Sequence, residues 1–149
     1  MTTPLEGLAY GMAAELPVGY EDAVALARGA LAERGFGVLT EIDVRATLKK
    51  KLDVDFRPYV ILGACNPPFA HRALQSELPI GLLLPCNVIV YAGDRPGTSV
   101  VAALDPVAQL GLTGRTDMAP LAGEVRDRLV QALESVRRAT GSTMTPERN

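Results

Sequence analysis

The chain is short of the residues from which most recognisable sites are built. Its 149 residues include no tryptophan, one histidine and two cysteines. Two cysteines are too few for a disulfide framework, so we expect free thiols in a reducing compartment and assign the protein to the cytoplasm. A metal centre would need closely spaced cysteines or histidines, and we therefore assign no metal ligand and no cofactor.

Long apolar runs and an excess of one charge are missing as well. No run reaches about 18 apolar residues, and the N-terminal segment lacks the basic start and apolar core of a signal peptide. Fifteen Lys and Arg residues oppose seventeen Asp and Glu residues. The only basic run, Lys49-Lys50-Lys51, is short and lies on a predicted amphipathic helix, where a solvated face is expected. We predict no nucleic-acid partner and no membrane partner.

Apolar residues, at 48% of the sequence, are sufficient for one compact core. We expect a single domain over residues 1–140. The last residues, GSTMTPERN, contain too little apolar surface to hold a fixed structure, so residues 141–149 are predicted to be a flexible tail.

Local patterns predict a two-layer α+β fold, with a mostly antiparallel sheet and helices packed on one face. Strands are predicted at 8–16, 36–42, 58–64, 86–91 and 99–104. Helices are predicted at 20–34, at 44–52 after the capping Asp43, after Asn66, and at 118–139. The turn residues AGDRPGT join the last two strands as a hairpin, which favours this fold over a parallel alternative.

The most distinctive feature is a repeated Cys-Asn pair, Cys65-Asn66 and Cys86-Asn87, each beside an apolar run. Proline after Asn66 predicts a helix that Asn66 caps, with Cys65 at the end of a strand and His71 about one turn into the helix. If the strands that carry the two cysteines are antiparallel, both thiols lie at the same end of the sheet. A parallel crossover would separate them.

Three functions fit these residues. The leading hypothesis is a binding or sensor-like module for a small polar or anionic ligand, in a pocket lined by Cys65, Asn66, His71, Arg72, Cys86 and Asn87. One alternative is a thiol-dependent enzyme or redox protein whose catalytic candidates are Cys65, Cys86 and His71. The other is a structural dimer module without catalysis, in which the cysteines are inert packing residues.

Three segments in this order, GACNPPFAHRAL, IGLLLPCNVIVY and ALDP, resemble the bacterial and archaeal proteins grouped as domain of unknown function 302. The resemblance covers roughly Tyr10 to Arg138. It implies a compact α+β fold and a homodimer, with no established activity. Looser members of this family keep the Asn-Pro and Asp-Pro elements without the cysteines. One departure is Ala92, because an acidic residue commonly follows the tyrosine that corresponds to Tyr91.

Overall fold

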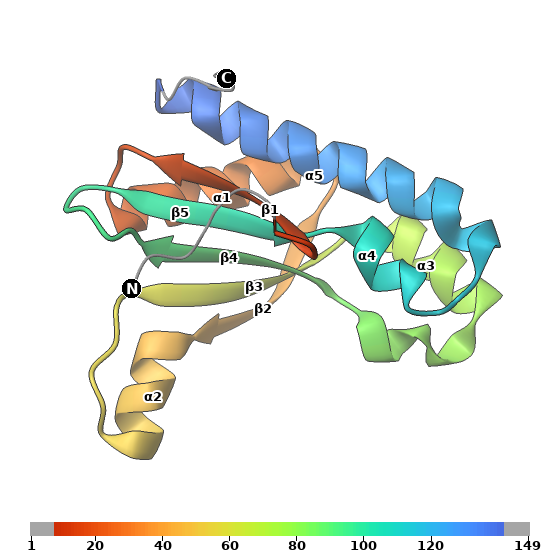
Figure 1. The fold of residues 1–149 in the computed structure, drawn as a ribbon, viewed down its shortest axis with the longest axis horizontal. Coiled ribbons are helices and arrows are strands. Elements are labelled where there is room, and N and C mark those ends of the chain that lie inside the picture. Colours follow the sequence, from red (N-terminus) through yellow and green to blue (C-terminus); the bar gives the residue numbers. More distant parts are fainter. Residues whose placement is uncertain (1–7, 142–149) are drawn as a thin grey trace.

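A five-stranded antiparallel sheet forms the centre of the protein, which is seen here as a computed structural model that describes residues 8–141 (Figure 1). The strand order across the sheet is β1-β5-β4-β3-β2. The strands are β1 (Gly11–Leu16), β2 (Gly37–Asp43), β3 (Tyr59–Cys65), β4 (Cys86–Ala92) and β5 (Ser99–Leu104). The helices are α1 (Tyr20–Glu33), α2 (Val44–Leu52), α3 (Pro67–Ser76), α4 (Pro106–Gly111) and α5 (Ala119–Ala139), with short 3-10 turns η1 (Leu78–Leu83) and η2 (Thr116–Met118).

Helices α1 and α5 lie together across one face of the sheet (Figure 1). In β4, Val88 and Val90 point toward these helices and are buried, whereas the alternate side chains of Ile89 and Tyr91 reach the opposite face, as strand geometry requires. The predicted two-layer α+β fold is therefore confirmed. Within residues 8–141, no helix combines the length and the apolar character needed to cross a membrane.

The antiparallel pairing of β3 with β4 decides where the cysteines lie. Ala64 is paired with Cys86, so Cys65, the last residue of β3, is one position beyond the pair. The two Cys-Asn segments therefore meet at one end of the sheet, as expected for antiparallel neighbours. The predicted hairpin between β4 and β5 is confirmed by their antiparallel register.

Beyond that end of the sheet, α3, η1 and α4 form a separate group of short helices (Figure 1). Asn66 caps α3, because its side-chain oxygen accepts a hydrogen bond from the backbone amide of Phe69 at 3.4 Å, which confirms the predicted cap. Asp105 caps α4 in the same manner, through the amide of Val107 at 2.9 Å. The sequence patterns predicted no helix here, but α4 begins at Pro106, directly after this cap.

Helix α2 lies apart from the other helices, at the edge of the sheet that β2 forms (Figure 1). Its predicted cap is confirmed, since Asp43 accepts a hydrogen bond from the amide of Ala46 at 2.8 Å. None of its residues is buried. The predicted tail is not tested here, because residues 142–149 lie outside the described residues.

Candidate functional site

A cavity of about 350 Å³ lies where the short helices meet the end of the sheet. We call it the corner cavity. Among residues 8–141, the side chains that line it are mostly apolar and none is charged. The lining residues come from seven elements: Leu39 and Thr40 of β2, Ala64 and Cys65 of β3, Phe69, Ala70, Ala73 and Leu74 of α3, Gly81 of η1, Cys86 of β4, Pro106, Gln109 and Leu110 of α4, and Leu121 and Val125 of α5, with Phe36, Asn66, Leu84 and Pro85 between them. Its size is at the lower end of the roughly 300–1,000 Å³ common for ligand pockets.

The turn geometry of α3 determines which of its side chains face the cavity. Phe69 and Ala73 are four residues apart, as are Ala70 and Leu74, so both pairs lie on one side of the helix and line the cavity. His71 falls on the opposite side and is exposed. The imidazole therefore does not line the corner cavity.

Asn66 is buried between the cavity and the loop that follows α1. Only 8% of its surface is exposed. Gly35 makes room for its amide, because a Cβ at Gly35 would lie 3.0 Å from the Asn66 nitrogen, and Gly35 also has a φ of +85°, which favours glycine. Asn66 thus connects the start of α3 to the end of α1 as well as contributing a polar group to the cavity wall.

Cys86 is hydrogen-bonded to Gln109, a residue that is only 6% exposed. The Cys86 thiol donates to Gln109 Oε1 at 3.4 Å, and Gln109 Nε2 donates to the carbonyl oxygen of Leu83. Burial, and secondly the neighbouring Cys65, raise the pKa of the Cys86 thiol to about 11. Cys86 therefore remains a neutral thiol at physiological pH, which does not suit a nucleophile.

Alkylation tests this protonation state. With a pKa near 11, about one Cys86 thiol in a thousand is ionised at pH 8, compared with about one in four for a free cysteine of pKa 8.5. We expect iodoacetamide to label Cys86 at least a hundredfold more slowly in the native protein than in urea, with the native rate rising about tenfold per pH unit. Mass spectrometry of the Cys86 peptide measures both rates. Equal native and unfolded rates at pH 8 would contradict the assignment.

The structure brings together only part of the predicted pocket. Cys65, Asn66 and Cys86 line the corner cavity, and neither cysteine is in a disulfide. Asn87 is exposed and lies on the other face of the sheet, because neighbouring residues of a strand alternate. Arg72 is on the outside of α3. Its Nη2 lies 3.7 Å from Glu124 Oε1, and its guanidinium carbon lies 5.6 Å from the centre of the Phe69 ring.

The family model described as "Domain of unknown function DUF302" matches residues 12–136 of the chain. The chain belongs to the DUF302 family. The crystal structure of an uncharacterized conserved DUF302 protein from Bacillus stearothermophilus is similar to it, with 29% sequence identity and a TM-score of 0.79, covering 87% of this chain and 100% of that one. Among curated proteins, no match was found.

The three segments that carry the DUF302 resemblance all reach the corner cavity. Cys65 and Asn66 come from the first segment, Pro85 and Cys86 from the second, and Pro106 from the third. These segments are up to about forty positions apart in sequence. Chain folding, rather than sequence proximity, gathers them around one space.

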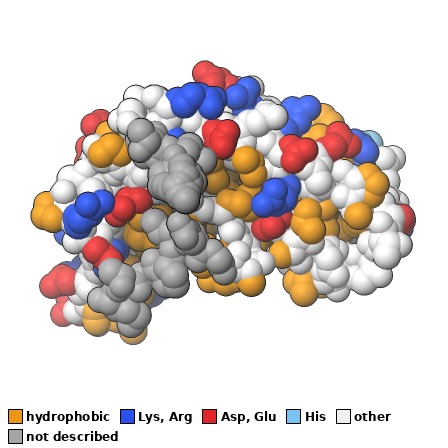
Figure 2. All heavy atoms as spheres, turned by 45° about the horizontal axis from the view of Figure 1, so that its top comes forward, with side chains coloured by type: hydrophobic (Ala, Val, Ile, Leu, Met, Phe, Trp, Pro, Cys, Tyr) orange, Lys and Arg blue, Asp and Glu red, His pale blue; other side chains and the backbone are white. Residues whose placement is uncertain are grey.

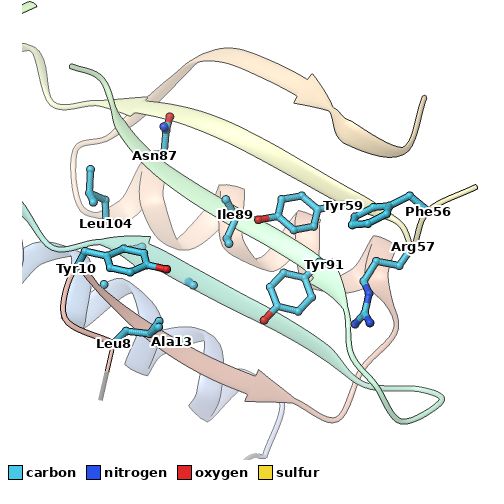
Figure 3. Close-up of a pocket in the computed structure, with 13 residues that line it drawn as sticks. Leu8, Tyr10, Ala13, Phe56, Arg57, Tyr59, Asn87, Ile89, Tyr91 and Leu104 are labelled. Carbon is cyan, nitrogen blue, oxygen red and sulfur yellow. The ribbon is translucent and has the colours of Figure 1, made fainter. Parts of the chain in front are cut away.

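A second hollow of about 480 Å³ lies on the sheet face opposite α1 and α5, and we call it the open-face hollow (Figure 3). Tyr59 and Tyr91 stack with ring centres 5.2 Å apart, and Tyr10 approaches from the other side. The guanidinium carbon of Arg57 lies 5.8 Å from the centre of the Tyr91 ring. Arg57 Nη1 donates hydrogen bonds to Asp94 Oδ1 and to the carbonyl oxygen of Ala92. In this DUF302 chain, Asp94 thus supplies a carboxylate near Ala92.

The sequence interpretation missed Gln109 and the tyrosines of the open-face hollow. The signal for the tyrosines was present, because Ile89 and Tyr91 alternate with buried valines along β4 and mark a second apolar face. Gln109 had no comparable signal, since its importance depends on the unpredicted helix α4.

Figure 2 shows acidic, basic and hydrophobic side chains interspersed over one face of the molecule. Among residues 8–141, no three His, Cys, Asp or Glu side chains are placed to hold a metal ion together.

Proposed function

We propose that the protein is a binding module for a small molecule with an apolar body and an uncharged polar group, held in the corner cavity. The convergence of three separate sequence segments on one mostly apolar cavity is the observation that supports this function. Ligand pockets are commonly apolar spaces with a few placed polar groups. Here those groups are the thiols and the side chains of Thr40 and Asn66, whereas both ends of the Gln109 amide are already bonded within the protein.

The cavity wall favours an uncharged ligand over an anionic one. His71 and Arg72 lie outside it, and none of the described residues that line it carries a charge. The amide of Phe69 is already bonded to Asn66, while Pro67 and Pro68 have no amide hydrogen to donate. A buried carboxylate or phosphate would therefore lose its hydration without gaining a cation.

Titration with 1-decanol by isothermal calorimetry tests this function. We expect saturable binding of one molecule per chain, with a negative heat-capacity change that reports burial of apolar surface. Sodium decanoate, which has the same chain length and a charged end, should bind at least tenfold more weakly. No saturable binding of decanol, or tighter binding of decanoate, would contradict the proposal.

We also propose that the protein forms a homodimer through α2 and its neighbouring segments. Helix α2 has no buried residue, and Ile42, Leu52 and Val54 on or beside it are 48%, 66% and 42% exposed. Within the chain α2 contacts β2 and β3, and a helix of nine residues is only marginally stable by itself, so further packing on its exposed side would stabilise it. A second copy of the chain packed on this surface would cover these apolar side chains.

Sedimentation equilibrium of Leu52→Glu tests the dimer. The wild-type protein should have twice the mass of one chain, and Leu52→Glu should shift the equilibrium toward the monomer by at least tenfold because it buries a charge in the interface. The matched control, Lys50→Glu, changes an exposed residue of the same helix. A monomeric wild-type protein, or equal effects of both substitutions, would refute this surface.

A further inference from the structure

Another hollow, of about 450 Å³, lies directly behind one wall of the corner cavity. We call it the outer hollow. It is also mostly apolar, and its lining includes Tyr10, Leu82, Leu104 and Leu112. Leu84, Pro85 and Gln109 line both spaces, so these three residues form the wall that separates them.

Gln109 is the polar member of this wall, and its side chain is fixed from two directions. Its amide nitrogen donates to the Leu83 carbonyl oxygen, and its amide oxygen accepts from the Cys86 thiol. Moving the side chain would leave a carbonyl group and a thiol without these partners. Buried polar groups resist such a loss, so the wall is closed in the ground state.

We propose that Gln109 sets the length of the ligand and that the ligand class is an unbranched alkyl chain with an uncharged polar end. This inference rests on the proposed function of the corner cavity. Gln109 lines both spaces and both linings are mostly apolar, so removal of its side chain would join them into one longer apolar space that suits an extended alkyl chain. A ligand chain that extends from the corner cavity toward the outer hollow is therefore stopped at Gln109.

A series of straight-chain alcohols from 1-butanol to 1-dodecanol tests this inference by calorimetry. For the wild-type protein, affinity should rise about fourfold per methylene until the cavity is full and should then stop rising. In Gln109→Ala, the rise should continue, so that the longest alcohols bind at least tenfold more tightly than to the wild type. The shortest alcohols should bind within about threefold of the wild-type affinity, because their chains do not reach the wall.

Gln109→Leu is the matched control, because leucine restores much of the bulk without the amide. It should keep the chain-length limit of the wild type. If Gln109→Ala does not fold, Gln109→Asn provides the comparison, since it shortens the side chain by one methylene and should extend the limit by one or two carbons.

The outcomes separate the two proposals. Equal chain-length limits in the wild type and in the folded shortened variant would overturn the role of Gln109 while leaving the cavity as a binding site. A Gln109→Leu variant that accepts the longest alcohols would also overturn it, because the amide and not the bulk would then matter. Absence of binding for every alcohol in the wild type would refute the proposed function itself.

Discussion

Replacing Ala70 with phenylalanine should weaken decanol binding by at least tenfold, the largest effect on ligand affinity that we expect from one substitution. Ala70 lies on the cavity side of α3, and the larger ring would occupy space that the ligand needs. A tenfold loss corresponds to about 1.4 kcal/mol of binding free energy. Calorimetric titration of the variant with decanol measures the change.

The matched control is Gln75→Phe, which introduces the same ring at an exposed position of the same helix. Both substitutions carry a similar helix-propensity cost of well under about 1 kcal/mol, so thermal unfolding should show both variants to be folded. If Gln75→Phe weakens binding as much as Ala70→Phe, or if Ala70→Phe binds normally, decanol does not occupy the corner cavity.

Leu129→Ala should destabilise the protein by about 2–5 kcal/mol, the largest effect on stability that we expect. Leu129 is only 1% exposed and lies on α5 near Val88 of β4, Val101 of β5 and Ala27 of α1. Its removal would leave a void between the helix layer and the sheet. The cost combines lost burial of apolar surface with the cavity that incomplete relaxation leaves behind.

Urea unfolding of Leu129→Ala beside Gln131→Ala measures this effect. Gln131 is exposed on the same helix, and its replacement should change the free energy of unfolding by less than about 0.5 kcal/mol. A loss below about 1 kcal/mol for Leu129→Ala would show that α5 does not pack on the sheet as described.

Local chemistry made much of the fold predictable. A capping residue marks the first turn of a helix in the sequence. The starts of α2 and α3 could therefore be predicted from Asp43 and Asn66. Asp105 before Pro106 carries the same signal as Asn66 before Pro67. Its helix was missed because only six residues follow the cap, too few to show a helical repeat of apolar residues.

The candidate site was less predictable, because its members depend on side-chain direction as well as position along the chain. Sequence proximity joined Cys86 to Asn87, yet strand alternation sends them to opposite faces of the sheet. His71 was associated with Cys65 because it is six positions away, but helix geometry turns it outward. The antiparallel pairing of β3 with β4 was the part of the prediction that brought both cysteines to one cavity.

The most direct test of the account is to locate bound decanol in the isotopically labelled protein by amide chemical-shift changes. We expect the largest changes on saturation at Ala70, Gly81 and Leu110, which come from three different elements around the corner cavity. Largest changes at Tyr59 and Tyr91 would place the ligand in the open-face hollow instead, and a spectrum unchanged by decanol would contradict the account.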